Sequence, residues 1–516
     1  MNFMSRALLP LTVFAACAVG TPTIQAPAVA ATTPIYRTIL QPGAQESQVI
    51  VSWRTRALGA KEVLELTSPT GALMTFPAAE RDAGAVFYKS NFATATGLAE
   101  NTTYSYRVGS PDAGWSATET FTTGSFGDDW SFIAVADPQV GVGGLINAQR
   151  DAWQNTIATA VAEDPDASLI WSLGDQVEGW GLLEAQYDAF FAAPEIRHIP
   201  TNALVGNHEY YPSQLALGDY DEHFINPHQA ADIRDYYFER NNILFIEIDS
   251  NRDSAADIER HKQFIQATID ERGAHNDWII LGMHHSFYSQ GSHHFDAGVQ
   301  RLRAELSPFI SQMNIDAVLS GHDHIYTRSH LMNGTTPVEP ARDPARGDVL
   351  NPSDGEVLYI TTTTAGGGKY YDFTDRNNVK HPDARFENID KSLEHDSTAV
   401  WRQDYTEDYM IVEVTEQALT FTTYNANDPN VVDKVTLRNR DASSNPGGTT
   451  PGASNPGANN PDADNPGSGS TTSEDQQSSA GAVIGIILAV LALLGGAGAL
   501  LGPLATNLPG VRKFLP

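Results

Sequence analysis

The spacing of apolar residues changes character near residue 125. Before that point, residues 48–53 and 104–108 alternate apolar and polar side chains with a period of two. This alternation is typical of strands that bury one face and expose the other. Residues 33–125 are therefore predicted to form an all-β domain.

Beyond residue 129, short apolar runs alternate with longer segments of helical periodicity. The expected strands are 131–136, 168–173, 201–205, 278–283 and 317–319, and the expected helices are 146–163, 257–272 and 299–313. Later strands, at 357–362, 409–414 and 418–424, are expected to extend a second sheet. The alternation of strands and helices predicts an α/β domain over residues 129–427.

Five of these strands run directly into a side chain that can carry chemistry. The residues are Asp137, Asp175, Asn207, His284 and His322. Ligands of α/β folds gather at the carboxyl ends of the strands, so the repetition places these side chains along one rim of the domain. We expect them to form a single site.

Carboxylate, carboxamide and imidazole groups together suit Fe, Mn and Zn ions. With His324 added, the rim offers enough ligands for two ions bridged by one carboxylate. Two ions about 3.5–4 Å apart can bind phosphate oxygens, generate a hydroxide nucleophile and stabilise the leaving oxygen. Histidine usage agrees with this interpretation, because seven of the 15 histidines lie in four short motifs.

The net charge of the chain limits which kinds of molecule it can bind. Lys and Arg total 32 against 63 Asp and Glu, so the formal net charge is −31. Such an acidic chain repels nucleic-acid backbones, which excludes a nucleic-acid-binding surface. An anionic phosphate substrate then needs local positive charge, and metal ions supply it.

The N-terminus is typical of a secretory signal peptide over residues 1–30. A positive start, an apolar stretch and the small residues of Ala28-Val29-Ala30 follow one another. The alternative is a lipoprotein signal that ends at Cys17. Since Cys17 is the single cysteine, its removal with the signal peptide would exclude thiol catalysis, disulfides and thiolate metal sites.

The C-terminus has three parts. Residues 441–479 are rich in Gly, Pro, Ser, Thr and Asn and are predicted to be a disordered linker. Residues 480–502 are apolar and uncharged, which predicts a transmembrane helix, and residues 503–516, with Arg512 and Lys513, a short cytoplasmic tail. This order predicts a protein anchored at the cell surface with its catalytic domain outside. Whether proteolysis in the linker releases that domain is left open.

The motifs of the rim occur in a recognisable order. They are Asp137-Pro138-Gln139, Gly174-Asp175, Gly206-Asn207-His208-Glu209, Met283-His284-His285 and Gly321-His322-Asp323-His324. The series resembles the calcineurin-like metallophosphoesterases, and within them the purple acid phosphatase branch. Residues 98–104 have the spacing of the tyrosine corner of fibronectin type III-like sandwiches, and such a domain begins many proteins of this branch. The resemblance implies a four-layer β-sandwich flanked by helices, preceded by the fibronectin-like sandwich.

The resemblance also implies a role for each matching residue. Asp137, Asp175 and His324 would hold the first metal ion, and Asp175 would bridge to a second ion held by Asn207, His284 and His322. The adjacent His208 would protonate the leaving group or orient the substrate. His293 and His294 match the substrate-facing histidines of the family more loosely.

Two positions depart from the pattern of many relatives. Gln139 stands where a histidine ligand is common, and its carbonyl is a weaker ligand for the metal. Glu178 stands where the coloured purple enzymes carry a tyrosine, so we predict a colourless enzyme. The identity of the two divalent or trivalent ions, among Fe, Mn and Zn, is not fixed by the sequence.

These observations favour an extracytoplasmic phosphomonoesterase, similar to acid phosphatases, that attacks a small phosphate ester with a metal-bound hydroxide. One alternative is a phosphodiesterase that acts on nucleotides, phospholipids or wall polymers with the same core. The other is a non-catalytic binding protein of the cell surface that keeps the fold without turnover. Metal content and a diester assay discriminate among the three. Oligomeric state is not readable from the sequence.

Overall fold

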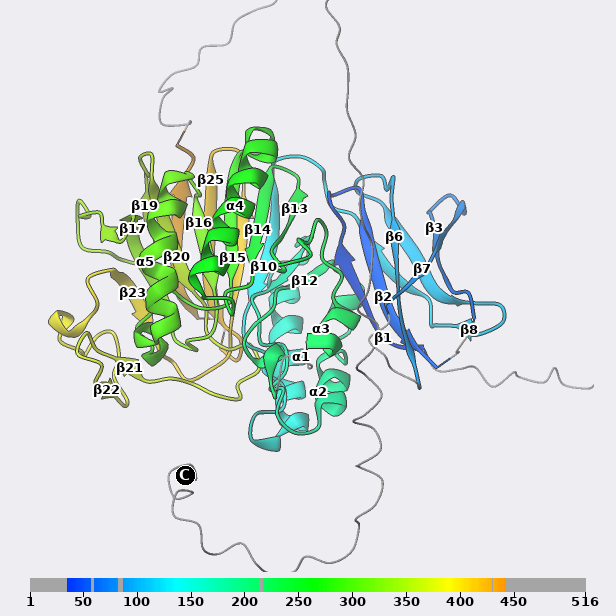
Figure 1. Ribbon diagram of the computed structural model, residues 1–516, viewed down its shortest axis with the longest axis horizontal. Helices are drawn as coiled ribbons and strands as arrows, with labels where there is room; N and C mark the ends of the chain where they lie inside the picture. Colours follow the sequence, from blue (N-terminus) through cyan, green and yellow to red (C-terminus); the bar gives the residue numbers. More distant parts are fainter. Residues whose placement is uncertain (1–34, 57–59, 82–86, 213–216, 429, 441–516) are drawn as a thin grey trace, which may run out of the picture. The chain divides into compact units, whose positions relative to one another are not determined.

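The computed structural model describes residues 35–56, 60–81, 87–212, 217–428 and 430–440 (Figure 1). The predicted signal peptide, linker and cytoplasmic tail, residues 1–30, 441–479 and 503–516, lie outside the described residues.

The N-terminal domain is a sandwich of two antiparallel sheets. One sheet has the order β1-β2-β6-β5, with the bounds β1 Ile35–Pro42, β2 Val49–Thr55, β6 Lys89–Ala95 and β5 Ala79–Arg81. The other has the order β4-β3-β7-β8 with β9 beside β7, and its bounds are β4 Leu73–Pro77, β3 Val63–Thr67, β7 Thr103–Ser110, β8 Gly114–Trp115 and β9 Glu119–Thr122. Trp53, Leu64 and Tyr106 pack between the sheets. The backbone N–H of Ala99 donates to the Tyr104 hydroxyl at 3.0 Å, which forms the predicted tyrosine corner.

The second domain is built on two larger sheets. The first has the order β12-β11-β10-β24-β25-β26-β19, with β10 Trp130–Val135, β11 Ile170–Ser172, β12 Thr201–Ala203, β19 Asp348–Leu350, β24 Asp408–Val414, β25 Ala418–Asn425 and β26 Val431–Arg438. The second has the order β13-β14-β15-β16-β20-β17-β18 with β23 beside β17, and comprises β13 Tyr236–Arg240, β14 Ile243–Ile248, β15 Trp278–Met283, β16 Ala317–Ser320, β17 Tyr326–Asn333, β18 Thr336–Pro337, β20 Glu356–Thr361 and β23 Thr398–Arg402. The short pair β21 Phe373–Thr374 and β22 Lys380–His381 lies in the loop that connects β20 to β23.

The alternation of side chains along each strand produces four layers. On β10, Phe132 and Ala134 face a core shared by the two sheets, whereas Ile133 and Val135 face helices. Helices α1 Ile146–Glu163, α2 Leu183–Phe190 and α3 Leu217–His223 cover the first sheet. Helices α4 Ala255–Arg272 and α5 Ala297–Gln312 cover the second. Within each sheet the central strands that lead to the site are parallel, so their carboxyl ends share an edge.

Two buried arginines and the carboxylates around them join the sandwich to the second domain. Arg54 of β2 is 1% exposed and contacts Glu222 of α3, Asp219 at 3.2 Å and Glu184 of α2 at 3.1 Å. Arg37 of β1 contacts Glu184 at 2.8 Å and Asp188 at 2.7 Å. The two arginines therefore hold helices α2 and α3 against the sandwich.

The predicted membrane anchorage requires correction. None of the helices in the described ranges is long and apolar enough to cross a membrane. The 18-residue helices α1 and α4 carry charged residues on their exposed faces. The predicted transmembrane helix at 480–502 lies outside the described residues, so the structure supports neither that helix as part of the fold nor its anchoring of the chain at the cell surface.

Candidate metal centre

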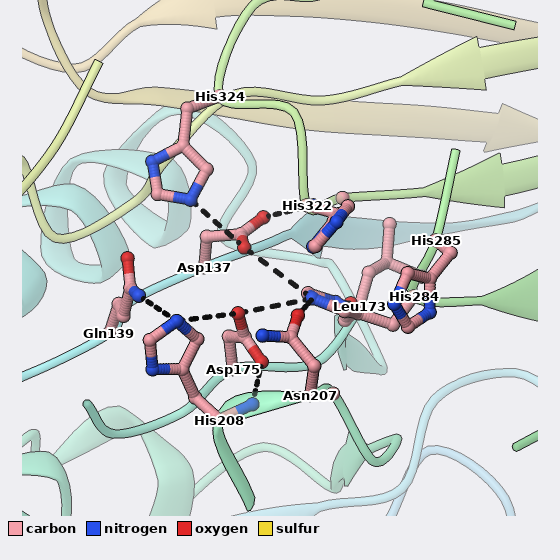
Figure 2. Close-up of polar contacts among 12 residues, drawn as sticks. Asp137, Gln139, Leu173, Asp175, Asn207, His208, His284, His285, His322 and His324 are labelled. Atoms are coloured by element: carbon pink, nitrogen blue, oxygen red, sulfur yellow. Dashed lines mark hydrogen bonds and ion pairs between the residues drawn. The ribbon is translucent and has the colours of Figure 1, made fainter. Parts of the chain in front are cut away.

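The carboxyl ends of five strands bring the predicted rim residues together (Figure 2). Asp137 follows β10, Asp175 follows β11 and Asn207 follows β12, all in the first sheet. His284 and His322 come from the facing sheet, after β15 and β16. Their side chains meet between the two sheets, as the strand-end pattern predicts.

The two aspartates are the centre of the cluster. Nε2 of His284 lies 3.1 Å from Oδ2 of Asp175 and 3.0 Å from Oδ1 of Asn207. Nε2 of His324 lies 3.2 Å from Oδ1 of Asp137. Both aspartates are at most 1% exposed, so their charges are concentrated in a small, dry volume.

The histidines are oriented by the backbone. Nδ1 of His284 donates to the Leu173 carbonyl at 2.8 Å, and Nδ1 of His324 donates to the Lys369 carbonyl at 2.6 Å. Each bond fixes the ring so that Nε2 points toward the aspartates. This arrangement is typical of histidines that bind a metal through Nε2, since the second nitrogen then needs a partner to fix its tautomer.

Burial and charge act on these groups in opposite directions. Burial lowers the pKa of His284, but the carboxylates of Asp175 and Asp137 raise it to about 10. Burial raises the pKa of Asp175, yet His284 and His208 hold it below its usual value. Burial lowers the pKa of His322 well below the usual range, and the neighbouring imidazoles lower that pKa further. The site therefore combines the ionised carboxylate of Asp175 with at least one neutral imidazole.

The backbone at the rim turns sharply. Asp137, Asp175 and His322 have φ values of 49°, 55° and 72°, in the left-handed region. Such backbone is uncommon outside glycine and is frequent at functional sites. The turn after each strand aims the side chain back into the space between the sheets.

A glycine precedes each of Asp175, Asn207 and His322, because the packing leaves no room for a side chain at those positions. A Cβ at Gly206 would collide with the carboxylate and the backbone nitrogen of Asp175. A Cβ at Gly321 would collide with the carboxylate of Asp137. The Gly-Asn-His-Glu and Gly-His-Asp-His motifs thus combine a ligand with the close approach that places it.

Alanine at Gly206 is therefore expected to displace Asp175 and to weaken metal binding by about 10- to 100-fold, the usual loss when the support of a ligand is removed. Equilibrium dialysis with Mn or Zn measures this affinity. Gly127→Ala is the matched control, because its Cβ would meet the Ser125 hydroxyl at 3.2 Å, far from the site in sequence. Unchanged affinity in Gly206→Ala would show that Asp175 is not held by this contact.

Comparison with known families decides the classification. A model of the purple acid phosphatase N-terminal domain matches residues 35–123, and a model of the calcineurin-like phosphoesterases matches residues 131–326. Residues 131–326 therefore form a calcineurin-like phosphoesterase domain. The chain carries the N-terminal domain of the purple acid phosphatase branch, which confirms the resemblance seen in the motifs. Members of this family are metal-dependent phosphoric ester hydrolases, and the family implies a dinuclear metal centre.

Individual relatives are distant. Purple acid phosphatase 23 from Arabidopsis thaliana is 24% identical over 177 residues, which is 33% of this chain and 37% of the relative. Two uncharacterised proteins from Mycobacterium tuberculosis strains are 28% identical over 112 residues, 21% of this chain and 20% of theirs. A purple acid phosphatase from yellow lupin (Lupinus luteus) seeds shares the fold, with a TM-score of 0.62 at 15% identity, over 79% of this chain and 74% of that one. The aligned parts of the three curated relatives are well under half of their lengths.

Two groups of side chains in the phosphoesterase domain are close enough together to hold a metal ion. One ligand atom each from Asp175, His284 and His322 lie within 4.8 Å of one another. A second group, His293, Asp296 and His322, meets the same criterion but includes an exposed carboxylate. Mixed carboxylate and imidazole donors suit Fe, Mn and Zn, as the sequence predicts. The chemistry of the set does not distinguish among the three.

His208 lies beside this cluster, with a different set of contacts. Its Nδ1 donates to the Glu178 carbonyl at 2.6 Å, and its Nε2 lies 2.6 Å from Nε2 of Gln139 and 3.9 Å from Oδ2 of Asp175. Oδ1 of Asp175 accepts from the backbone N–H of His208 at 2.8 Å. The imidazole is thus fixed at the edge of the site, with Nε2 facing inward. Oε1 of Gln139 is buried and has no hydrogen-bond partner among the described residues, which leaves a carbonyl oxygen available as a ligand.

The two candidate substrate histidines have different surroundings. The ring of His293 lies 4.2 Å from that of His322, and its Nδ1 lies 2.7 Å from Oδ2 of Asp296. The ring of His294 packs instead against His395, at 4.0 Å, and burial lowers its pKa to about 2. His293 therefore contacts a candidate metal ligand, His322, whereas His294 contacts His395.

Glu209 is a positioning residue that the sequence analysis did not assign. Its buried carboxylate accepts the backbone N–H groups of Asp175, Gln176 and Gly206, at 3.0, 2.8 and 2.7 Å. Burial and the charge of Asp175 raise the pKa of Glu209 to about 8. The sequence contains one indication of this role, because Glu209 is the last residue of the Gly-Asn-His-Glu motif.

Lys369 and Tyr371 also reach the site without having been predicted. The tyrosine ring lies 4.9 Å from His324 and 5.2 Å from His293. The ammonium of Lys369 lies 5.3 Å from the centre of that ring. Both follow a run of three glycines, residues 366–368. Their proximity depends on a distant loop, so no local pattern indicated it.

Proposed function

We propose that the chain hydrolyses phosphate monoesters at a dinuclear metal centre. One observation carries the proposal. Two buried aspartates converge with imidazoles whose Nε2 atoms are directed at them by backbone carbonyls. The purple acid phosphatase N-terminal domain supports a monoester rather than a diester as substrate.

We assign the ligands from their contacts and their family positions. Asp137, Asp175 and His324 would hold one ion, with Oε1 of Gln139 as an additional donor. Asn207, His284 and His322 would hold the second ion, with Asp175 as the ligand shared between the two. When bound, the two ions supply the positive charge that neutralises phosphate oxygens and acidifies a water molecule.

Side chains of the protein donate the proton, bind the phosphate and position the ligands. His208, once protonated at Nε2, would give that proton to the oxygen of the leaving alcohol after the Gln139 amide turns away from this nitrogen, and its Nδ1 bond to the Glu178 carbonyl keeps the ring in place. We assign the non-bridging phosphate oxygens to His293, which packs on His322, and to Lys369, which packs on Tyr371. Glu209 keeps the backbone of Asp175 and Gly206 in register.

Alanine at His208 is expected to slow hydrolysis in proportion to the basicity of the leaving alcohol. A proton donor contributes about 10²- to 10⁴-fold, so alkyl phosphates should lose at least about 100-fold in kcat. 4-Nitrophenyl phosphate, which leaves without protonation, should lose about tenfold or less. His275→Ala, at an exposed position, is the control. An equal loss for both esters would remove the proton-donor assignment.

The proposed function itself is tested with matched aryl phosphate mono- and diesters after loading with Mn, Zn or Fe. Metal-dependent turnover of the monoester, absent in Asn207→Ala, supports the proposal. Preference for the diester would make the chain a phosphodiesterase. A folded chain without turnover under any metal would favour a binding protein and contradict catalysis.

A further inference from the structure

The surface near His208 displays an aromatic side chain to solvent. Trp180 is 52% exposed, and Leu182, in the same turn, is 72% exposed. Aromatic side chains are normally buried where packing allows, because they remove a large apolar area from water. An indole left in solvent close to a catalytic centre indicates a surface that binds something apolar.

Three rings lie in sequence from the site to this surface. The ring of Tyr211 packs edge to face on His208, with centroids 5.0 Å apart and planes at 85°. The indole of Trp180 in turn packs against Tyr211, with centroids 5.3 Å apart and planes at 33°. The exposed indole is therefore connected to the catalytic imidazole through a single tyrosine.

The backbone holds the indole in this position. Oε1 of Gln186 accepts from the Gly179 N–H at 2.9 Å, and its Nε2 donates to the Trp180 carbonyl at 2.5 Å. Gln186 is itself 1% exposed. At the other end of the same turn, the Glu178 carbonyl accepts from His208, and the Glu178 N–H donates to Val140 in the loop that carries Asp137. One short segment thus fixes both the catalytic imidazole and the exposed indole.

The position of the rings of Tyr211 and Trp180 beside His208 places them near the leaving alcohol of the substrate. His208 is the group that gives a proton to the leaving oxygen, so the leaving alcohol lies on the side of His208. A group attached to that oxygen meets Tyr211 and Trp180 as it extends toward solvent.

We propose that Trp180 and Tyr211 form a stacking surface for a planar ring on the leaving alcohol. Preferred substrates are then phosphate monoesters whose leaving alcohol carries a planar ring, which is either an aryl group or the base of a nucleoside. The inference rests on the proposed function and specifies its substrate class. Stacking on one aromatic side chain is worth about tenfold or more in affinity.

The test uses matched pairs of esters and one residue. Adenosine 5′-monophosphate is compared with ribose 5-phosphate, which has the same leaving oxygen, and phenyl phosphate with glycerol 3-phosphate. Trp180→Ala should raise KM about tenfold for the ring-bearing ester of at least one pair, with kcat nearly unchanged, and alter its partner less than twofold. Trp180→Phe should retain most of the preference. Phe87→Ala removes a distant aromatic side chain that is 81% exposed and should change nothing.

The pair that responds identifies the source of the ring. A response confined to the nucleotide pair indicates a nucleoside, and one confined to the phenyl pair indicates an aryl ester. Equal losses for both members of each pair, or no loss for any, would overturn the inference.

A binding measurement separates this inference from the proposed function. Phenylphosphonate and methylphosphonate lack the scissile ester bond, so calorimetry reports their binding to the metal-loaded chain even if no ester is hydrolysed. Tighter binding of phenylphosphonate that Trp180→Ala abolishes supports the stacking surface without reference to turnover. Equal binding of the two phosphonates, where the phenyl pair had responded in the assay, would overturn the aryl interpretation. Absence of turnover in the wild-type chain would overturn the proposed function alone.

Discussion

Asparagine in place of Asp175 is expected to reduce kcat/KM for a phosphate monoester by at least about 1,000-fold, a loss comparable to that of other groups that stabilise charge in the transition state. Asp175 is 1% exposed and contacts both His284 and the backbone of His208. If it bridges two ions, the substitution removes one negative charge from both while it keeps the shape of the side chain. Metal content, measured by elemental analysis beside the kinetics, should fall below two equivalents per chain.

The control for this prediction is Asp270→Asn, which neutralises an exposed carboxylate on α4. It should leave turnover and metal content unchanged. Near-normal turnover with full metal content in Asp175→Asn would contradict the bridging assignment. Loss of turnover with full metal content would restrict Asp175 to a role in substrate binding or in the orientation of His208.

Methionine in place of Arg54 is expected to lower the free energy of unfolding by about 3–5 kcal/mol, the cost of removing one partner from a buried ion pair. Arg54 and Glu222 are 1% and 4% exposed, so the substitution leaves the carboxylate of Glu222 buried without its cation. Burial raises the pKa of Glu222, and Arg54 opposes that rise. Chemical denaturation followed by tryptophan fluorescence measures the change in stability.

Two further variants identify the cause of that loss. Arg150→Met removes an arginine whose partner, Asp151, is exposed, and should cost less than about 1 kcal/mol. The double variant Arg54→Met with Glu222→Met should recover most of the stability, because no unpaired charge remains buried. If the double variant is as unstable as Arg54→Met, the loss arises from packing and not from the unpaired charge.

Much of the fold follows from local patterns. The predicted helix at 146–163 coincides with α1, whose buried residues share one face, and the strand at 278–283 coincides with β15, a continuous apolar run. Strands 409–414 and 418–424 were expected in the second sheet, but β24 pairs antiparallel with β10 in the first. The pairing of distant strands depends on tertiary packing, which local periodicity does not contain.

Some residues of the candidate site could be predicted from local patterns in the sequence, and others could not. Asp137, Asp175 and His284 were selected because each ends a strand, and the structure places them together. Lys369 reaches the site through a loop that follows β20, so its position depends on how that loop folds back on His324. The contact between the rings of Trp180 and Tyr211 could not be predicted from the sequence either, because it joins two separate turns.

The central claim is that the chain is a phosphoesterase that works with two metal ions. It is tested most directly by a metal titration of the purified full-length chain. The chain is stripped with a chelator and titrated with Mn, Zn or Fe, while bound metal and monoester hydrolysis are measured on the same samples. We predict that turnover rises with bound metal and saturates at two equivalents per chain, and that Asn207→Ala binds less and has no turnover. Turnover that survives complete removal of metal, or a wild-type chain that binds fewer than two equivalents of every metal, would contradict the account.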